Sequence, residues 1–117
     1  MPTFLENGLQ VVDQELIDDV VRRIVQRFDP ERIVLFGSHA RGDATPESDI
    51  DLFVEMKTNL RPVLRAYEIQ RFFGLRAWGL DVFVYTPDEV KNCRGRIGDL
   101  LSYVDAEGKL LYERPIR

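Results

Sequence analysis

The sequence has one cysteine, one histidine and no long run of apolar residues. A lone thiol cannot form an internal disulfide, so the cysteine content does not indicate an oxidising compartment. No stretch approaches the ~20 apolar residues of a membrane-spanning helix, and the N-terminus lacks the basic and apolar segments of a signal peptide. We therefore expect a cytoplasmic protein without a membrane segment.

Positive charge is also scarce, because 16 lysines and arginines face 20 aspartates and glutamates, for a net charge of −4. This balance argues against direct binding to nucleic acid, since the whole chain would repel a polyanion. Thirteen of the 16 cations are arginine, which suits forked contacts with phosphate and carboxylate. Most of these arginines are nevertheless expected on solvated helix faces.

The chain has 117 residues, of which 44% are hydrophobic, as is typical of one globular domain. We predict a single domain over residues 1–117, with residues 1–12 as a loose lead-in. Apolar residues three and four apart predict a helix that begins after Asp13, its N-cap, and ends at Asp29 before a proline. Pro62 and Pro87 each predict the start of another helix.

Short apolar or alternating segments predict four strands, over residues 33–36, 49–55, 80–85 and 109–112. A turn or short helix is expected over residues 38–42, and a further helix over residues 97–104. This order of elements predicts an α/β (α+β) fold, in which a small mixed sheet has helices packed on one face. The other face would carry acidic side chains.

Those acidic side chains include three aspartates on predicted strands, Asp49, Asp51 and Asp81. Asp49 and Asp51 are two residues apart and share a face, and Asp81 has the equivalent position on the next strand. If the two strands are neighbours, the three carboxylates converge and repel one another unless a cation neutralises them. Oxygen ligands of this kind suit Mg²⁺ or Mn²⁺, and two such ions can hold both oxygens of a displacement at phosphorus.

A second group of candidate residues, Gly37, Ser38 and Arg41, directly follows the first strand. Gly37 allows a close approach of backbone to a ligand, and amides at the start of a helix favour phosphate. The Ser38 hydroxyl and the Arg41 guanidinium can each bind a phosphate oxygen. Each feature alone has a plainer interpretation as a turn or a surface ion pair, but their conjunction favours phosphoryl chemistry.

The segment from Gly37 to Leu52 contains Gly-Ser, ten residues and then Asp-Ile-Asp. This pattern resembles the signature of the DNA polymerase β-like nucleotidyltransferase superfamily, and the strand around Asp81 is similar to the one that bears its third carboxylate. The short chain, Ala40-Arg41-Gly42 and Ser48 are most similar to the minimal nucleotidyltransferase (MNT) subgroup. The resemblance implies the polymerase β-like fold.

The resemblance also implies roles for these residues. Asp49 and Asp51 would hold two Mg²⁺ ions on an NTP, and Asp81 would complete the second metal site and help to activate the acceptor hydroxyl. The nucleotide and its phosphates would be bound by Gly37, Ser38, Arg41 and Ser48. ATP is expected as the NTP by analogy.

Relatives of the MNT subgroup are antitoxins paired with HEPN toxins, which implies a HEPN-type protein as the acceptor of AMP. Two alternatives stay open, a non-catalytic module that masks its partner and a transferase that modifies a small molecule. The roles of His39 and Cys93 stay open too, as does the formation of a homo-oligomer. Phe72, Phe73 and Trp78 are expected in the core rather than in an interface.

Overall fold

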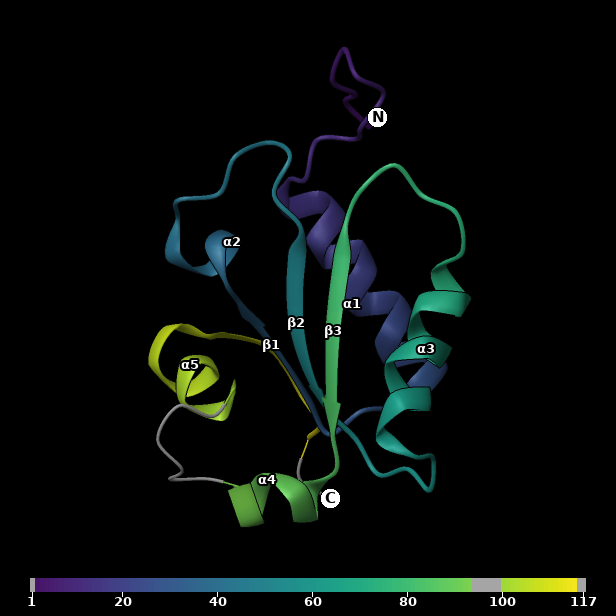
Figure 1. Cartoon of the computed structure of the whole chain (residues 1–117), viewed down its shortest axis with the longest axis vertical. Helices are drawn as coiled ribbons and strands as arrows, with labels where there is room; N and C mark the ends of the chain where they lie inside the picture. The colour runs from purple at the N-terminus through teal and green to yellow at the C-terminus, as the bar shows by residue number, and fades with distance from the viewer. Residues whose placement is uncertain (1, 94–99, 116–117) are drawn as a thin grey trace.

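The strands form one mixed sheet in the order β3-β2-β1-β4 (Figure 1). The computed structural model describes residues 2–93 and 100–115. β1 is antiparallel to both β2 and β4, and β2 is parallel to β3. Along the chain the elements are α1 (Gln14–Phe28), β1 (Arg32–Phe36), α2 (Ser38–Arg41), β2 (Ile50–Glu55), α3 (Pro62–Phe73), β3 (Leu80–Tyr85), α4 (Pro87–Cys93), α5 (Leu100–Glu107) and β4 (Lys109–Glu113).

The expected fold class and order of elements are confirmed. α1 begins at its predicted cap, where the Asp13 side chain accepts the Leu16 N–H at 2.9 Å. It ends at Asp29, which has a φ of 50° and precedes Pro30. The first part of the helix expected over residues 97–104 lies outside the described residues. None of the described helices is long and apolar enough to cross a membrane.

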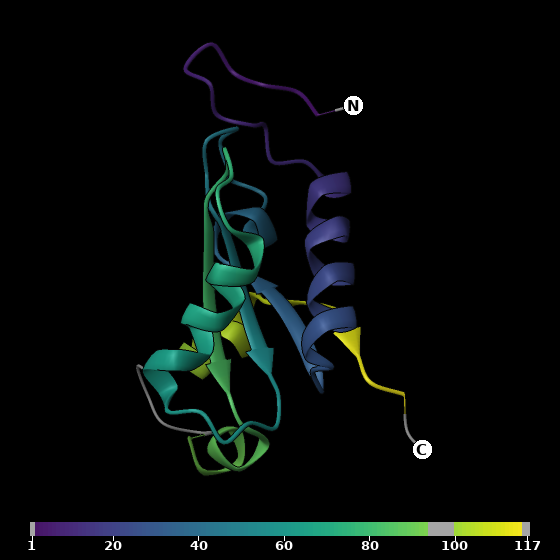
Figure 2. The ribbon, with the colours of Figure 1, turned by 90° about the vertical axis from the view of Figure 1, so that its right-hand side faces the viewer.

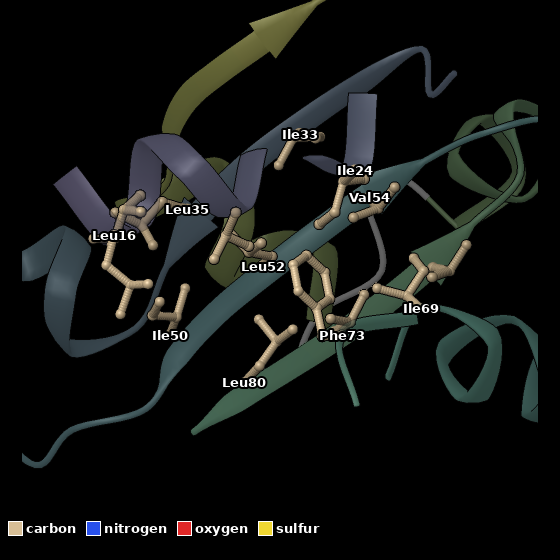
Figure 3. Packing of buried hydrophobic residues seen from close by; sticks show 14 of the residues in the cluster. Leu16, Ile24, Ile33, Leu35, Ile50, Leu52, Val54, Ile69, Phe73 and Leu80 are labelled. Carbon is tan, nitrogen blue, oxygen red and sulfur yellow. The ribbon is translucent and has the colours of Figure 1, made fainter. Parts of the chain in front are cut away.

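The main core lies between α1, α3 and one face of the sheet (Figures 2 and 3). Strand residues that alternate along β2 and β3 point into it and are almost fully buried, as the sequence alternation predicts. These residues are Ile50, Leu52, Val54, Leu80, Val82 and Val84. The two longest helices therefore share one face of the sheet, as expected.

The other face of the sheet is not left to acidic side chains alone. Val34, Phe36 and Phe53 project from it, and Leu101 and Val104 of α5 cover them together with Val90 of α4. The expectation of helices on a single face therefore needs correction. Three strand residues on this face are large and apolar, so leaving them uncovered would expose a wide hydrophobic patch. α4 and α5 cover these apolar residues, and Asp51 and Asp81 lie at the end of this face where β2 and β3 begin.

The aromatic residues at the end of α3 form a connected cluster. Phe73 is buried, its ring centroid lies 5.8 Å from that of Trp78, and Phe72 lies 5.2 Å from Phe73. Phe72 also packs edge-on against Phe28 of α1 at 5.6 Å. The cluster thus joins α1 to α3, although Phe72 is 37% exposed.

The lead-in segment is tied to the rest of the chain rather than free. Phe4 and Gln10 form an isolated antiparallel bridge, and the Gln10 N–H donates to the Ala77 carbonyl at 2.6 Å. These contacts place the segment at the same end of the sheet as the loop before β3 (Figure 1).

Arg65 is the charged side chain of α3 that lies inside the structure, with 8% of its side chain exposed. Its Nη1 donates to Glu89 Oε1 at 2.6 Å and to the Val84 carbonyl at 3.4 Å, and its Nε donates to the Leu60 carbonyl at 3.0 Å. One guanidinium thereby connects α3, β3 and α4.

We predict that Arg65→Ala lowers the free energy of unfolding by about 2 kcal/mol, because it removes the donor of the buried Val84 carbonyl and of two partly buried acceptors. The control is Arg71→Ala on the same helix, whose side chain is 69% exposed and lies 3.7 Å from Glu68. Arg71→Ala should lower the free energy of unfolding by less than about 0.5 kcal/mol. Urea unfolding measures both, and equal midpoints for the two variants would contradict the prediction.

Candidate functional site

The strand register brings the three predicted aspartates to one end of the sheet. β2 and β3 are parallel neighbours in which Asp51 lies opposite Asp81 and Ile50 opposite Leu80. Asp49 directly precedes β2, beside Gly79, whose carbonyl accepts the Ile50 N–H at 2.9 Å. The C-terminal end of antiparallel β1 meets the same place, because Phe36 pairs with Asp51. The residues after β1 therefore adjoin the aspartates.

Two glycines make room for two of the carboxylates. A Cβ atom at Gly37 would overlap Asp51 Oδ2, and one at Gly79 would overlap Asp49 Oδ1. Gly37 has the further constraint of a φ of 77° and a ψ of −158°, which other residues rarely adopt. The site thus depends on glycine for close approach as well as for backbone conformation.

Asp51 occupies the most crowded position of the three. Burial, and after it the neighbouring charges of Asp81 and Asp49, together raise the pKa of its carboxyl from 3.8 to about 6. The protonated form shares a hydrogen bond with the Asp81 side chain, while His39 acts weakly in the opposite sense. Asp51 and Asp81 therefore form a close acidic pair that would gain from a cation.

The three aspartate side chains do not form a complete metal-binding site in the rotamers of this structure. Among residues 2–93 and 100–115, no three acidic, histidine or cysteine side chains are grouped so that they could hold one ion together. Asp51 faces Asp81, whereas Asp49 lies against Gly79. Asp49 is exposed, so its carboxylate is free to take another rotamer toward the pair.

The loop over residues 37–42, here called the glycine–serine loop, follows β1 and contains the short helix α2. The Ala40 and Arg41 amides donate to the Gly37 carbonyl, at 3.1 Å and 3.0 Å. The Ser38 and His39 amides start the helix, so they have no carbonyl within it to bond. Two adjacent backbone donors and the Ser38 hydroxyl could thus bind the oxygens of an anion.

Arg41 does not point freely into the site. Its Nη1 lies 3.2 Å from Glu107 Oε1, and its Nε lies 3.4 Å from Asp43 Oδ2. Asp43 and then Glu107 raise the pKa of Arg41 above its ordinary value. The phosphate contact predicted for Arg41 would require it to share its donors with these carboxylates.

Ser48 and His39 have structural partners. The Ser48 Oγ accepts the Thr45 N–H at 2.9 Å, and the Ser48 carbonyl lies 3.0 Å from His39 Nε2, which must donate to it. His39 thereby fixes the loop before β2 onto α2, and Ser48 closes a turn. Cys93, a free thiol at the end of α4, is half-buried against the apolar residues below the site.

Comparison with known proteins identifies the family. The model of a protein family described as "Nucleotidyltransferase domain" matches residues 17–103, which include the glycine–serine loop and all three aspartates. The chain belongs to this nucleotidyltransferase family. The resemblance seen in the sequence is thereby confirmed.

Individual relatives agree with this membership. A protein of Methanocaldococcus jannaschii named "Putative protein adenylyltransferase MJ1379" is 32% identical over 80 residues, which cover 65% of this chain and 80% of that protein. A crystal structure of a "putative nucleotidyltransferase" from Sulfolobus solfataricus is 25% identical, with a TM-score of 0.59, over 86% of this chain and 79% of that one. A crystal structure of "the toxin-antitoxin with AMP-PNP" shares the fold at 22% identity and a TM-score of 0.59, over 83% of this nucleotidyltransferase and 73% of that chain.

Sequence reasoning missed two residues that shape this site. Gly79 carries a visible signal, since it is a glycine that directly precedes the strand bearing Asp81. Glu107 carries none, because it stands 66 residues after Arg41 on an otherwise ordinary helix. Only the pairing of β1 with β4 brings it to the loop.

We predict that Gly79→Ala lowers nucleotidyl transfer by about a hundredfold while the fold persists, because the added methyl group would lie 3.2 Å from the Asp49 Cβ atom and so shift Asp49 in every rotamer. Gly74→Ala is the contrasting control, because its φ of 64° is strained for alanine but nothing lies near its Cβ. It should lower stability by about 1 kcal/mol and leave the rate unchanged. A Gly79→Ala enzyme with the wild-type rate would contradict this account.

We further predict that Asp51 makes the metal-free protein less stable as the pH rises. Because its folded pKa is about 6 and its unfolded value is 3.8, the folded state binds the extra proton, and stability falls as the pH rises from 3.8 through 6. Asp51→Asn should remove this loss and stabilise the protein at pH 7.5 by roughly 1 kcal/mol, less than the full shift because the group is partly hydrated.

Thermal unfolding in EDTA between pH 5 and 7.5 measures this effect. Asp18→Asn replaces an exposed carboxylate on α1 and should behave as wild type. The prediction fails if Asp51→Asn and wild type have the same melting temperature at pH 7.5.

Proposed function

We propose that this nucleotidyltransferase is a metal-dependent adenylyltransferase that moves AMP from ATP to a hydroxyl group of a partner protein. The observation that carries the proposal is the register of β2 and β3, which sets Asp51 opposite Asp81 beside the glycine–serine loop. Phosphate-binding donors and carboxylates thus share one end of the sheet.

The close carboxylates of Asp51 and Asp81 suit a divalent metal ion. Burial and repulsion keep a proton on Asp51 up to a pH of about 6, and a cation would neutralise the ionised pair above that pH. Asp49, Asp51 and Asp81 would hold Mg²⁺ or Mn²⁺, with Asp49 turning from Gly79 toward the other two. Bound metal would neutralise phosphate charge and polarise the α-phosphate.

The chain's own residues then have separate tasks. The Ser38 and His39 amides and the Ser38 hydroxyl hold the terminal phosphates of the triphosphate. Asp81 lies on an edge strand, is exposed, and accepts the proton of the incoming hydroxyl. The hydroxyl oxygen bonds to the α-phosphorus, the bond from that phosphorus to the β-phosphate oxygen breaks, and pyrophosphate leaves.

Two observations support a protein as the acceptor. The relative from Methanocaldococcus jannaschii has a name that denotes a protein adenylyltransferase, and it is 32% identical to this chain. The structure with AMP-PNP is a toxin–antitoxin assembly of the same fold. Together they favour a toxin as the partner, and the MNT resemblance favours one of the HEPN type.

A second candidate function is a module that binds the partner and masks it without transfer. The specific observation in its favour is that Asp49 lies against Gly79, apart from the close pair of Asp51 and Asp81. A chain of this kind would silence its partner whether or not the aspartates were present.

We predict that Asp49→Asn plus Asp51→Asn abolishes the transfer of label from α-³²P ATP to a protein acceptor in the presence of Mg²⁺. Without the carboxylates the α-phosphate loses its metal, which costs at least a thousandfold in rate, on the order of 4 kcal/mol. The acceptor is supplied by lysate of the source cells or by the product of the neighbouring gene. ATP labelled at the γ-phosphate is the parallel assay, and it should leave protein unlabelled.

Asp18→Asn is the matched control and should transfer label as wild type does. Label from α-³²P ATP that survives the double substitution would refute the proposal. A tight partner complex in which wild type transfers no label from any NTP would favour the masking module instead.

A further inference from the structure

Glu107 joins the last helix of the chain to the glycine–serine loop. Its Oε1 accepts the Gly37 N–H at 3.1 Å, and Arg41 Nη1 lies 3.2 Å from the same oxygen and 3.4 Å from Oε2. One carboxylate therefore holds both the first residue of the loop and the last residue of α2.

The position of Glu107 follows from the pairing of β1 with β4. Leu35 lies opposite Lys109 in this antiparallel pair, so the residues just before Lys109 lie near those that follow β1, and Glu107 comes within hydrogen-bond distance of Gly37. Behind it, Val104 of α5 packs into the apolar cluster below the site. Backbone pairing and core packing both fix where this carboxylate stands.

The burial of Glu107 also separates it from an ordinary surface ion pair. Only 23% of its side chain is exposed, whereas 46% of the Arg41 side chain is exposed. A carboxylate that is partly withdrawn from water forms stronger hydrogen bonds to a backbone amide and a guanidinium than a solvated one. These bonds help to hold Gly37 in its unusual backbone conformation.

Glu107 and Asp51 contact different sides of Gly37. Glu107 bonds its amide, and Asp51 lies where a side chain of Gly37 would be. The amides of Ser38 and His39, which start α2, are not used by Glu107 and stay free for phosphate. The carboxylate thus supports the loop from behind and does not fill the place of the nucleotide.

We propose that Glu107 is a positioning residue for nucleotide binding, which holds the glycine–serine loop and Arg41 in the arrangement that receives the triphosphate. This inference rests on the proposed function, because it assigns the loop to the phosphates of the same ATP. It concerns binding alone and can be judged separately from transfer.

The experiment measures the Kd of a non-hydrolysable ATP analogue with Mg²⁺ by titration calorimetry for wild type, Glu107→Ala, Glu107→Gln and Glu113→Ala. Glu107→Ala should raise the Kd about tenfold, since it removes hydrogen bonds to a backbone amide and a charged group. Glu107→Gln should raise it less, because the amide oxygen can still accept the Gly37 N–H. Glu113, an exposed glutamate at the opposite end of β4, provides the matched control and should leave the Kd unchanged.

Two further readouts separate positioning from a general loss of structure. In the transfer assay Glu107→Ala should raise the KM for ATP about tenfold and change kcat less than threefold. Adding Arg41→Ala to Glu107→Ala should weaken binding by less than the two single effects combined, since both act through one contact. If Glu107→Ala does not fold, Glu107→Gln tests the inference instead. A raised Kd in this variant would support it, and an unchanged Kd would overturn it.

An unchanged or lower Kd in Glu107→Ala would overturn the inference, and a lower Kd would mean that the carboxylate competes with phosphate. A wild-type chain that binds the analogue but never transfers label would refute the proposed function and leave the assignment of Glu107 intact. A wild-type chain that binds no nucleoside triphosphate would overturn both.

Discussion

Mutual repulsion among the site's carboxylates is the constraint on which the rest of this structure depends. Asp51 must be partly buried and still lie close to Asp81, which raises the pKa of Asp51 to about 6. Such a pair is stable only on a rigid support, because a flexible loop would move the charges apart. Parallel pairing of β2 with β3 provides that support, since six residue pairs lock the register that sets Asp51 opposite Asp81.

The backbone around the carboxylates is adapted to the same constraint. Gly37 and Gly79 have no side chain where Asp51 and Asp49 need space, and the apolar residues of the strands anchor the site from the opposite face. Side chains along β2 point alternately into the core and toward the site. Ile50 and Leu52 are fully buried, and the aspartates project from the opposite face. The site therefore adds unfavourable charge at one end of a sheet whose core holds it together.

Much of this arrangement could be predicted from the sequence because it depends on local patterns. The alternation in residues 49–55 and 80–85 fixes which side chains share a face, and Gly37 and Ser38 mark the end of the first strand. The order of these segments was enough to predict the fold class, and the spacing of the Gly-Ser and Asp-x-Asp motifs was enough to suggest the family. These features need no knowledge of distant contacts.

The remaining features depend on pairings between distant residues. The sequence could not show that α4 and α5 cover Phe36 and Phe53, since apolar strand residues do not indicate which helix buries them. It could not show that Ser48 bonds within its own turn, or that Arg41 meets Glu107. Each of these contacts depends on side-chain rotamers or on the path of the chain after β3.

The path of the chain after β3 matters because of the position of β4. β4 pairs with β1 on the side away from β2, so the segment that leads into it must pass the end of β1 where the glycine–serine loop begins. Any residue at the junction of α5 and β4 would lie close to Gly37, and the bond that Glu107 accepts from its amide makes use of this proximity. A side chain after Glu107 would collide with Val34 and the Val104 carbonyl, which explains why glycine follows it. The helix that leads into the last strand of the sheet thus carries a support for the loop, so that the order of the sheet couples the segment after β3 to the site built by the segments before it.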